Sequence, residues 1–270
     1  MPDIFQFVDD LDGDAQQRVV DRLEFRGNYA PFVAMRDAYL ARVRLPPEAR
    51  VCELGCGTGV VSRAIGAMDG FDGTVLGTDL SEVLVAEATR RAAQDGLDSV
   101  SFRADRTGGT GEPDASCDLV ILHTLISHVA DTDPVLSEAA RIARPGASIV
   151  VFDGDYASLT CHCGRPAEDE SVIASLLQAI VANPHVMRDM PRLLQARGLV
   201  VSDVSGDVLL EAGEADFFGS LVDSYVPIAV RAGALGEAEA AAWLERFRAA
   251  SAERRFFGSC NFVTYLAEAS

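Results

Sequence analysis

Lysine is absent from this chain, in which all 23 basic residues are arginines. Without lysine the chain cannot form the Schiff base on which conventional pyridoxal-phosphate enzymes and lysine aldolases depend. It also cannot complete a phosphate-binding P-loop, which requires a Gly-Lys-Ser/Thr sequence. This one absence therefore excludes three classes of enzyme.

Long apolar runs and a secretion signal are missing as well. No run approaches the roughly 18–20 apolar residues that span a bilayer, and residues 1–5 lack the basic and apolar regions of a signal peptide. We therefore expect a cytoplasmic protein. The formal net charge of −18 would repel a phosphate backbone. We expect a small-molecule partner and no nucleic acid, and we leave a homodimer open.

Matched pairs of metal ligands are also lacking. The six cysteines include one cluster, Cys161-His162-Cys163, whereas structural zinc sites usually contain two such pairs. Cytosolic thiols stay reduced, so an even number of cysteines does not imply disulfides. We predict no metal site and an ordinary loop over residues 161–163.

What the chain does contain is a regular alternation of short buried strands and helices. After one long helix over about residues 15–45, strands are predicted over 50–54, 74–78, 100–104, 118–122 and 148–152. Ser81 is the expected cap of a helix that Gly96 ends. This alternation is typical of βαβ units and a parallel sheet. Two more strands, over 199–210 and 256–266, follow helical stretches that resemble lids, beginning at residue 156.

A glycine-rich turn follows the first predicted strand, with the sequence Glu53-Leu54-Gly55-Cys56-Gly57-Thr58-Gly59. Glycine lets backbone amides approach a ligand without a Cβ in the way. The spacing differs from the Gly-x-Gly-x-x-Gly of dinucleotide-binding proteins. The carboxylate of Glu53 would repel a pyrophosphate but suits an ammonium or sulfonium group. The turn therefore disfavours an NAD-dependent oxidoreductase.

Two more acidic residues end the next two predicted strands. Asp79 can accept hydrogen bonds from both hydroxyls of a ribose, and Asp105 is placed to accept from an exocyclic amine such as that of adenine. Either residue alone is better explained as a turn residue or a helix cap. Three acids at the carboxyl ends of successive strands together favour a ligand site.

These motifs, in this order, resemble those of class I S-adenosylmethionine-dependent methyltransferases, in particular the group similar to the ubiquinone/menaquinone-biosynthesis (type 11) methyltransferases. The resemblance covers residues 48–153 in ordered motifs and residues 256–266 as the last strand. It implies an α/β fold with a Rossmann-like, seven-stranded, mostly parallel sheet, an antiparallel last strand and helical lid insertions. It also implies S-adenosylmethionine as cofactor, S-adenosylhomocysteine as product, and C-, O- or N-methylation of a small molecule.

The same resemblance assigns a domain plan and cofactor contacts. One domain over 1–270 would comprise a helical cap (1–45), a cofactor-binding half (48–153), a substrate-side half (156–255) and the last strand (256–266). Glu53 takes the place near the methionine amino group, Asp79 holds the ribose, and Asp105 lies beside the adenine. The other predicted contacts are Gly55, Cys56, Gly57, Leu80, Ala104, Arg106 and His123.

His128 is the candidate general base, because it follows the fourth predicted strand and imidazole titrates near pH about 6.5. The alternative is a histidine that only packs. Arg26 and Tyr29 are expected to close the N-terminal helix over the cofactor. Phe217 and Phe218 either line an acceptor cavity or belong to the core. A methyltransferase-like protein that uses its pocket for binding or for other chemistry is the alternative function.

Overall fold

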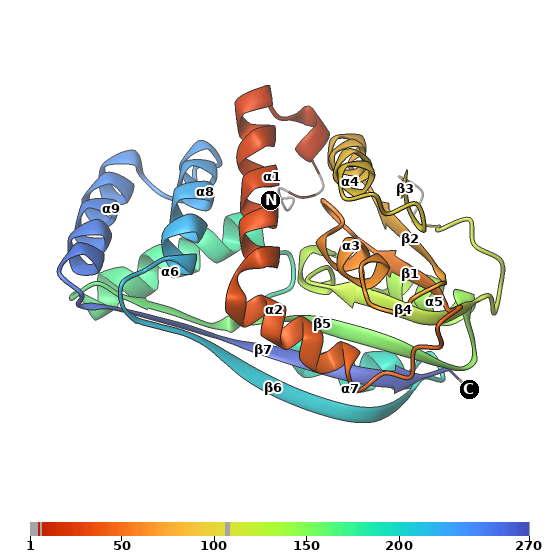
Figure 1. Ribbon diagram of the computed structural model, residues 1–270. Helices are drawn as coiled ribbons and strands as arrows, with labels where there is room; N and C mark the ends of the chain where they lie inside the picture. Colours follow the sequence, from red (N-terminus) through yellow and green to blue (C-terminus); the bar gives the residue numbers. More distant parts are fainter. Residues whose placement is uncertain (1–4, 6, 106–108, 270) are drawn as a thin grey trace.

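A seven-stranded sheet forms the centre of this computed structural model, which describes residues 5, 7–105 and 109–269 (Figure 1). The strands lie in the order β3-β2-β1-β4-β5-β7-β6. β7 runs antiparallel to both of its neighbours, and the other paired strands are parallel. The predicted sheet is confirmed. The strand bounds are β1 Arg50–Leu54, β2 Thr74–Asp79, β3 Val100–Ala104, β4 Cys117–His123, β5 Ala143–His162, β6 Val200–Gly213 and β7 Phe256–Glu268.

Helices cover both faces of the sheet. In Figure 1, α6, α8 and α9 stand over the far ends of the long strands, and α1 stands between them and the β1–β3 region. No helix in the described part of the chain is long and apolar enough to cross a membrane. The helix bounds are α1 Gly13–Asn28, α2 Ala30–Leu40, α3 Val60–Gly66, α4 Glu82–Gln94, α5 Asp133–Ile142, α6 Pro166–Ile180, α7 Val186–Gln195, α8 Phe217–Arg231 and α9 Glu237–Ala252, with short 3₁₀ turns η2 Val8–Asp10 and η3 Ile126–His128.

Local capping explains where several helices begin and end. The Ser81 side chain accepts a hydrogen bond from the Leu84 amide and starts α4, as predicted. The single helix predicted over 15–45 is wrong, because the chain breaks at Tyr29 into α1 and α2. Tyr29 is extended (ψ 127°) and Pro31 lies in the first turn of α2, where the fixed φ of proline favours a new helix start.

The fifth strand is much longer than the sequence indicates. β5 continues to His162 because β7 pairs with it along its length, with Cys161 opposite Gly258 and His162 opposite Phe257. The pairing is interrupted by a register shift between Asp155 and Thr160, an irregularity of the kind that locally bends a strand. The helical insertion expected from residue 156 therefore begins at α6, and the loop predicted over 161–163 is strand up to His162.

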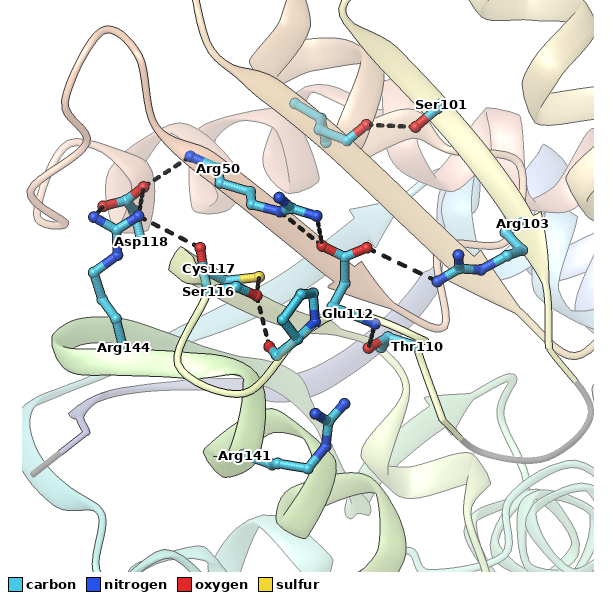
Figure 2. A network of polar contacts seen from close by, with 12 residues as sticks. Arg50, Ser101, Arg103, Thr110, Glu112, Ser116, Cys117, Asp118, Arg141 and Arg144 are labelled. Carbon is cyan, nitrogen blue, oxygen red and sulfur yellow. Dashed lines mark hydrogen bonds and ion pairs between the residues drawn. The ribbon is translucent and has the colours of Figure 1, made fainter.

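The segment between β3 and β4 is fastened to the body of the domain. Glu112 accepts hydrogen bonds from the Arg50 guanidinium and lies 4.0 Å from that of Arg103 (Figure 2). The amide and hydroxyl of Thr110 both donate to Glu138 on α5, at 2.6 Å. These contacts hold residues 110–112 against the body of the domain, and Gly109 and Thr110 line a pocket there.

Candidate functional site

The turn after β1 has a shape that requires glycine. Gly55, Gly57 and Gly59 have φ values of +67°, +53° and +75°. A Cβ on Gly55 would lie 2.4 Å from the Leu125 side chain, and one on Gly59 would lie 2.4 Å from Phe102. The glycines therefore allow both the sharp bend into α3 and the close packing around it.

Asp79 ties this turn to the end of β2. Its carboxylate accepts from the Gly57 amide (2.8 Å) and from the Ser81 amide (3.0 Å). The backbone continues the connection, because the Asp105 amide donates to the Asp79 carbonyl at 2.8 Å. Burial raises the pKa of Asp79, and the backbone hydrogen bonds oppose that rise. The ends of β1, β2 and β3 thus form one rigid edge.

Glu53 is a buried carboxylate at the same edge. It is 2% exposed and accepts from the amide (2.9 Å) and the hydroxyl (2.5 Å) of Ser62 on α3. Burial raises its pKa from 4.5 to about 7, against the two Ser62 hydrogen bonds that lower it. Its charge therefore depends on pH in the neutral range.

Two hollows meet at the glycine turn. The turn pocket has a volume of about 740 Å³ including its mouth, and places the cations Arg26 and Arg36 with the acids Glu53 and Asp79. The outer pocket, of about 760 Å³, runs past Asp79 to Leu80, Asp105, Gly109 and Thr110. Both pockets share the lining residues Phe5, Gly55, Asp79, Leu125 and His128. The turn pocket therefore contains charges of both signs, whereas the outer pocket has a more apolar wall.

Two threonines mark the turn pocket as a ligand site. The hydroxyl of Thr58 is buried and has no hydrogen-bond partner among the described residues, so a polar group in the pocket would satisfy it. Thr124 has a φ of +52°, which is costly without glycine and is commonest at functional sites. Arg26 donates to the Thr124 hydroxyl at 2.7 Å. Tyr29 points elsewhere, since its hydroxyl donates to Glu211 at 2.7 Å.

The two histidines differ in environment. His123 is buried, lies 3.0 Å from the Tyr39 hydroxyl through Nδ1, and stacks on Phe152. Burial holds its pKa well below the usual range, and the cations Arg26 and Arg36 lower it further. Its imidazole is therefore neutral. His128 ends η3 and lines both pockets, with its ring 4.6 Å from Phe5 and 6.1 Å from Tyr156.

Most of the predicted site residues come together here. Ala104 ends β3 beside Asp79 and is not among the described lining residues of either pocket. Arg106 lies outside the described residues. Those that line one or both pockets are Glu53, Gly55, Cys56, Gly57, Asp79, Leu80, Asp105, His123 and His128.

The N-terminal segment is the part of the site that the sequence did not reveal. Asp9 accepts from the Ser81 hydroxyl (2.5 Å) and from the amides of Glu82 (3.0 Å) and Val83 (3.3 Å), at the start of α4. This anchor leaves Phe5 lining both pockets. The contacts join residues more than 70 positions apart, and an isolated aspartate carries no signal for such a distant cap.

Residues 46–171 match a family model described as a methyltransferase domain. Over 238 residues the chain is 28% identical to an uncharacterized 37.1 kDa protein in transposon TN4556 of Streptomyces fradiae, which is 87% of this chain and 66% of that protein. Over 143 residues it is 31% identical to the ubiquinone biosynthesis O-methyltransferase of Sinorhizobium fredii, with 53% and 50% covered. The chain thus spans from half to just under two thirds of the length of these two curated relatives.

Three solved structures share the fold. They are the YcgJ protein of Bacillus subtilis (17% identity, TM-score 0.59, 87% of this chain and 98% of that one covered), the [4+2]-cyclase SpnF (16%, 0.57, 87% and 80%), and geranyl diphosphate C-methyltransferase of Streptomyces coelicolor A3(2) (17%, 0.54, 88% and 79%). The last was solved with Mg²⁺, geranyl diphosphate and S-adenosyl-L-homocysteine. At these identities the likeness concerns the fold.

Proposed function

The chain belongs to the class I S-adenosylmethionine-dependent methyltransferases, and on that basis we propose that it transfers a methyl group to a small-molecule acceptor. One observation carries the proposal. The glycine turn, whose Gly57 amide donates to Asp79, lies between the turn pocket, which contains Glu53, and the outer pocket, which contains Asp105. When bound, S-adenosylmethionine supplies the methyl group from its sulfonium sulfur.

The residues present fit this cofactor. We assign Glu53 to the ammonium group and Arg26 and Arg36 to the carboxylate of its amino-acid end, because these charges meet in the turn pocket. Asp79 and Asp105 serve the ribose and the adenine, as expected from their places at the ends of β2 and β3. A pyrophosphate fits poorly beside the carboxylates of Glu53 and Asp79.

The protein contributes mainly by positioning the acceptor against the methyl group and by excluding water from the site. Holding the acceptor in line with a methyl group can supply roughly 7–11 kcal/mol of barrier lowering. Where the acceptor must lose a proton, we assign His128 as the general base, since it borders both pockets. Phe5 and Tyr156 flank its ring and limit the access of water to it.

The acceptor is proposed only as a small molecule. Relatives named for ubiquinone biosynthesis and for arsenite support this choice, and C-, O- and N-methylation all stay open. We further propose that residues 1–270 act as one domain in the cytoplasm, where its six free cysteines would stay reduced. A homodimer and the absence of a nucleic-acid partner remain predictions.

A second candidate function is pocket use without methyl transfer. It is favoured by the shared fold of a [4+2]-cyclase, since one fold hosts unrelated chemistry. Incubation with methyl-labelled S-adenosylmethionine and an extract of small metabolites separates the two: label in a metabolite supports the methyltransferase. A cofactor that binds and never transfers its label supports the second function.

The first test is thermal melting with S-adenosylmethionine, S-adenosylhomocysteine and NAD in parallel. Ligand at about 100 times its dissociation constant adds about 2.7 kcal/mol, which raises the melting temperature of a domain of this size by several degrees. A rise with the two sulfur compounds and not with NAD is the expected result. No rise with either sulfur compound would contradict the proposed function.

A further inference from the structure

Arg22 is a buried cation outside the two pockets described above. It lies on α1, one helical turn before Arg26, and is 4% exposed. Burial lowers its pKa to about 10, and the neighbouring Tyr225 opposes that change. The guanidinium is therefore still charged at neutral pH.

This charge lacks an acidic partner. Arg22 forms no ion pair among the described residues, and its Nε and Nη1 are buried with no hydrogen-bond partner there. The guanidinium carbon lies 4.2 Å above the ring centre of Phe217. That contact stabilises the face of the cation. Tyr225 forms a hydrogen bond with the guanidinium, and the N–H groups of Nε and Nη1 are left without a partner among the described residues. Buried arginines are otherwise almost always paired, so a buried guanidinium without an acidic partner is unusual.

A third hollow opens onto Arg22. This arginine pocket is a narrow hollow of about 310 Å³ including its open mouth, with enclosed room for about one water molecule. It lies between α1 and α8 and is lined by Arg18, Arg22, Arg231, Ser224, Tyr225 and Phe5 among others. None of its lining residues is acidic, although the chain has 41 acidic and 23 basic residues. Arg231 also lies 3.9 Å from Asp12, so the positive charge of this pocket is concentrated at Arg18 and Arg22, with hydroxyl groups beside it.

The arginine pocket borders the site of the proposed reaction. Phe5 lines it together with the turn and outer pockets, and the Phe5 ring lies 4.6 Å from His128 and 6.4 Å from Tyr225. The Tyr156 ring lies 6.1 Å from that of His128. Aromatic rings thus line the way from the buried cation to the candidate base.

We propose that Arg22, with Arg18 and Arg231 at the rim, binds an oxyanion of the acceptor, a carboxylate or a phosphate on an apolar body. The proposal rests on the proposed function, because it names the class of acceptor for the same site. Arg22 supplies the buried donors that the anion satisfies. The neighbouring rings of Phe217, Tyr225 and Tyr156 suit an apolar or aromatic body.

The test uses small probes in place of the unidentified acceptor. Dissociation constants of benzoate, phenyl phosphate and neutral benzamide are measured by ligand-observed NMR, with S-adenosylhomocysteine at saturation. The proteins are the wild type, Arg22→Met and, as a matched control for lost charge, Arg248→Met, which alters an exposed arginine on α9. Arg22→Gln replaces Arg22→Met if the latter does not fold.

At least one anion should bind the wild type at least tenfold more tightly than benzamide, and the better anion identifies a carboxylate or a phosphate. Arg22→Met should abolish this preference while Arg248→Met keeps it. The melting temperature of ligand-free Arg22→Met should not fall, because the substitution removes an unpaired buried charge. Equal binding of benzamide and both anions to the wild type, or an unchanged preference in Arg22→Met, would overturn the proposal. Failure of S-adenosylhomocysteine to bind the wild type would instead contradict the proposed function.

Discussion

Glu53 should make the ligand-free protein less stable as the pH rises from acid to neutral. Its pKa is raised from 4.5 to about 7. Below the lower value the carboxyl is protonated in the folded and unfolded chains, and its full contribution to stability is present. As the pH rises from 4.5 to the folded-state pKa of about 7, that contribution is lost at about 1.4 kcal/mol per pH unit, about 3 kcal/mol in all.

Glu53→Gln isolates this effect, because glutamine keeps an oxygen for the Ser62 amide but cannot ionise. The free energy of unfolding is measured with urea at several pH values for both proteins. Relative to the wild type, the variant should gain about 2–3 kcal/mol between pH 5 and pH 8. A difference that stays constant with pH would refute the reasoning.

Glu87→Gln is the control, because the pKa of Glu87 is shifted in the opposite direction to that of Glu53. Hydrogen bonding from Arg90 and Arg91 lowers the pKa of Glu87. Its stabilising contribution is therefore present above the ordinary pKa and lost in acid. Replacing it should lower stability at neutral pH relative to acid, by less than in the Glu53 case, because exposed ion pairs contribute little.

Three further predictions concern the site. Asp79→Ala should weaken S-adenosylhomocysteine binding, measured by calorimetry, at least tenfold. The substitution removes a charged hydrogen-bond acceptor worth about 1.5–3 kcal/mol and leaves the Gly57 and Ser81 amides without their partner. Unchanged affinity would exclude the ribose role. His128→Gln should slow label transfer by about 10²–10⁴ with near-normal cofactor binding, whereas lost binding would make His128 structural. Asp9→Ala should lower the melting temperature by a few degrees through lost capping of α4, and Asp9→Asn by less.

The parallel half of the fold was predictable because its signals are local. Each of the first four strands is a short run of residues that ends at a polar turn, and Ser81 and Gly96 bracket α4 in the sequence itself. The length of β5 was not predictable. Residues 153–162 are strand because β7, about a hundred positions away, pairs with residues 153–155 and 160–162, and no pattern within 153–162 carries that information.

The site divides in the same way. The common placement of Glu53, Asp79 and Asp105 was predictable because each lies at or beside the end of a strand, and parallel strands bring their carboxyl ends to one edge. Asp9 and Phe5 were not, since their place depends on a distant helix start. The charge state of Glu53 also depends on burial, which is a property of the packed fold.

This division has a consequence for specificity. The proposed cofactor side is built from turns whose shape is set by residues adjacent in the sequence, whereas the proposed acceptor side lies near the extended β5–β7 pair. Tyr156 of β5 belongs to the same hydrophobic core as Phe217 of α8, over which Arg22 lies. Changes that shorten β5 or move α8 would therefore alter the environment of Arg22 without touching the glycine turn. A truncated pair should change which acceptor oxyanion binds while S-adenosylhomocysteine affinity stays the same.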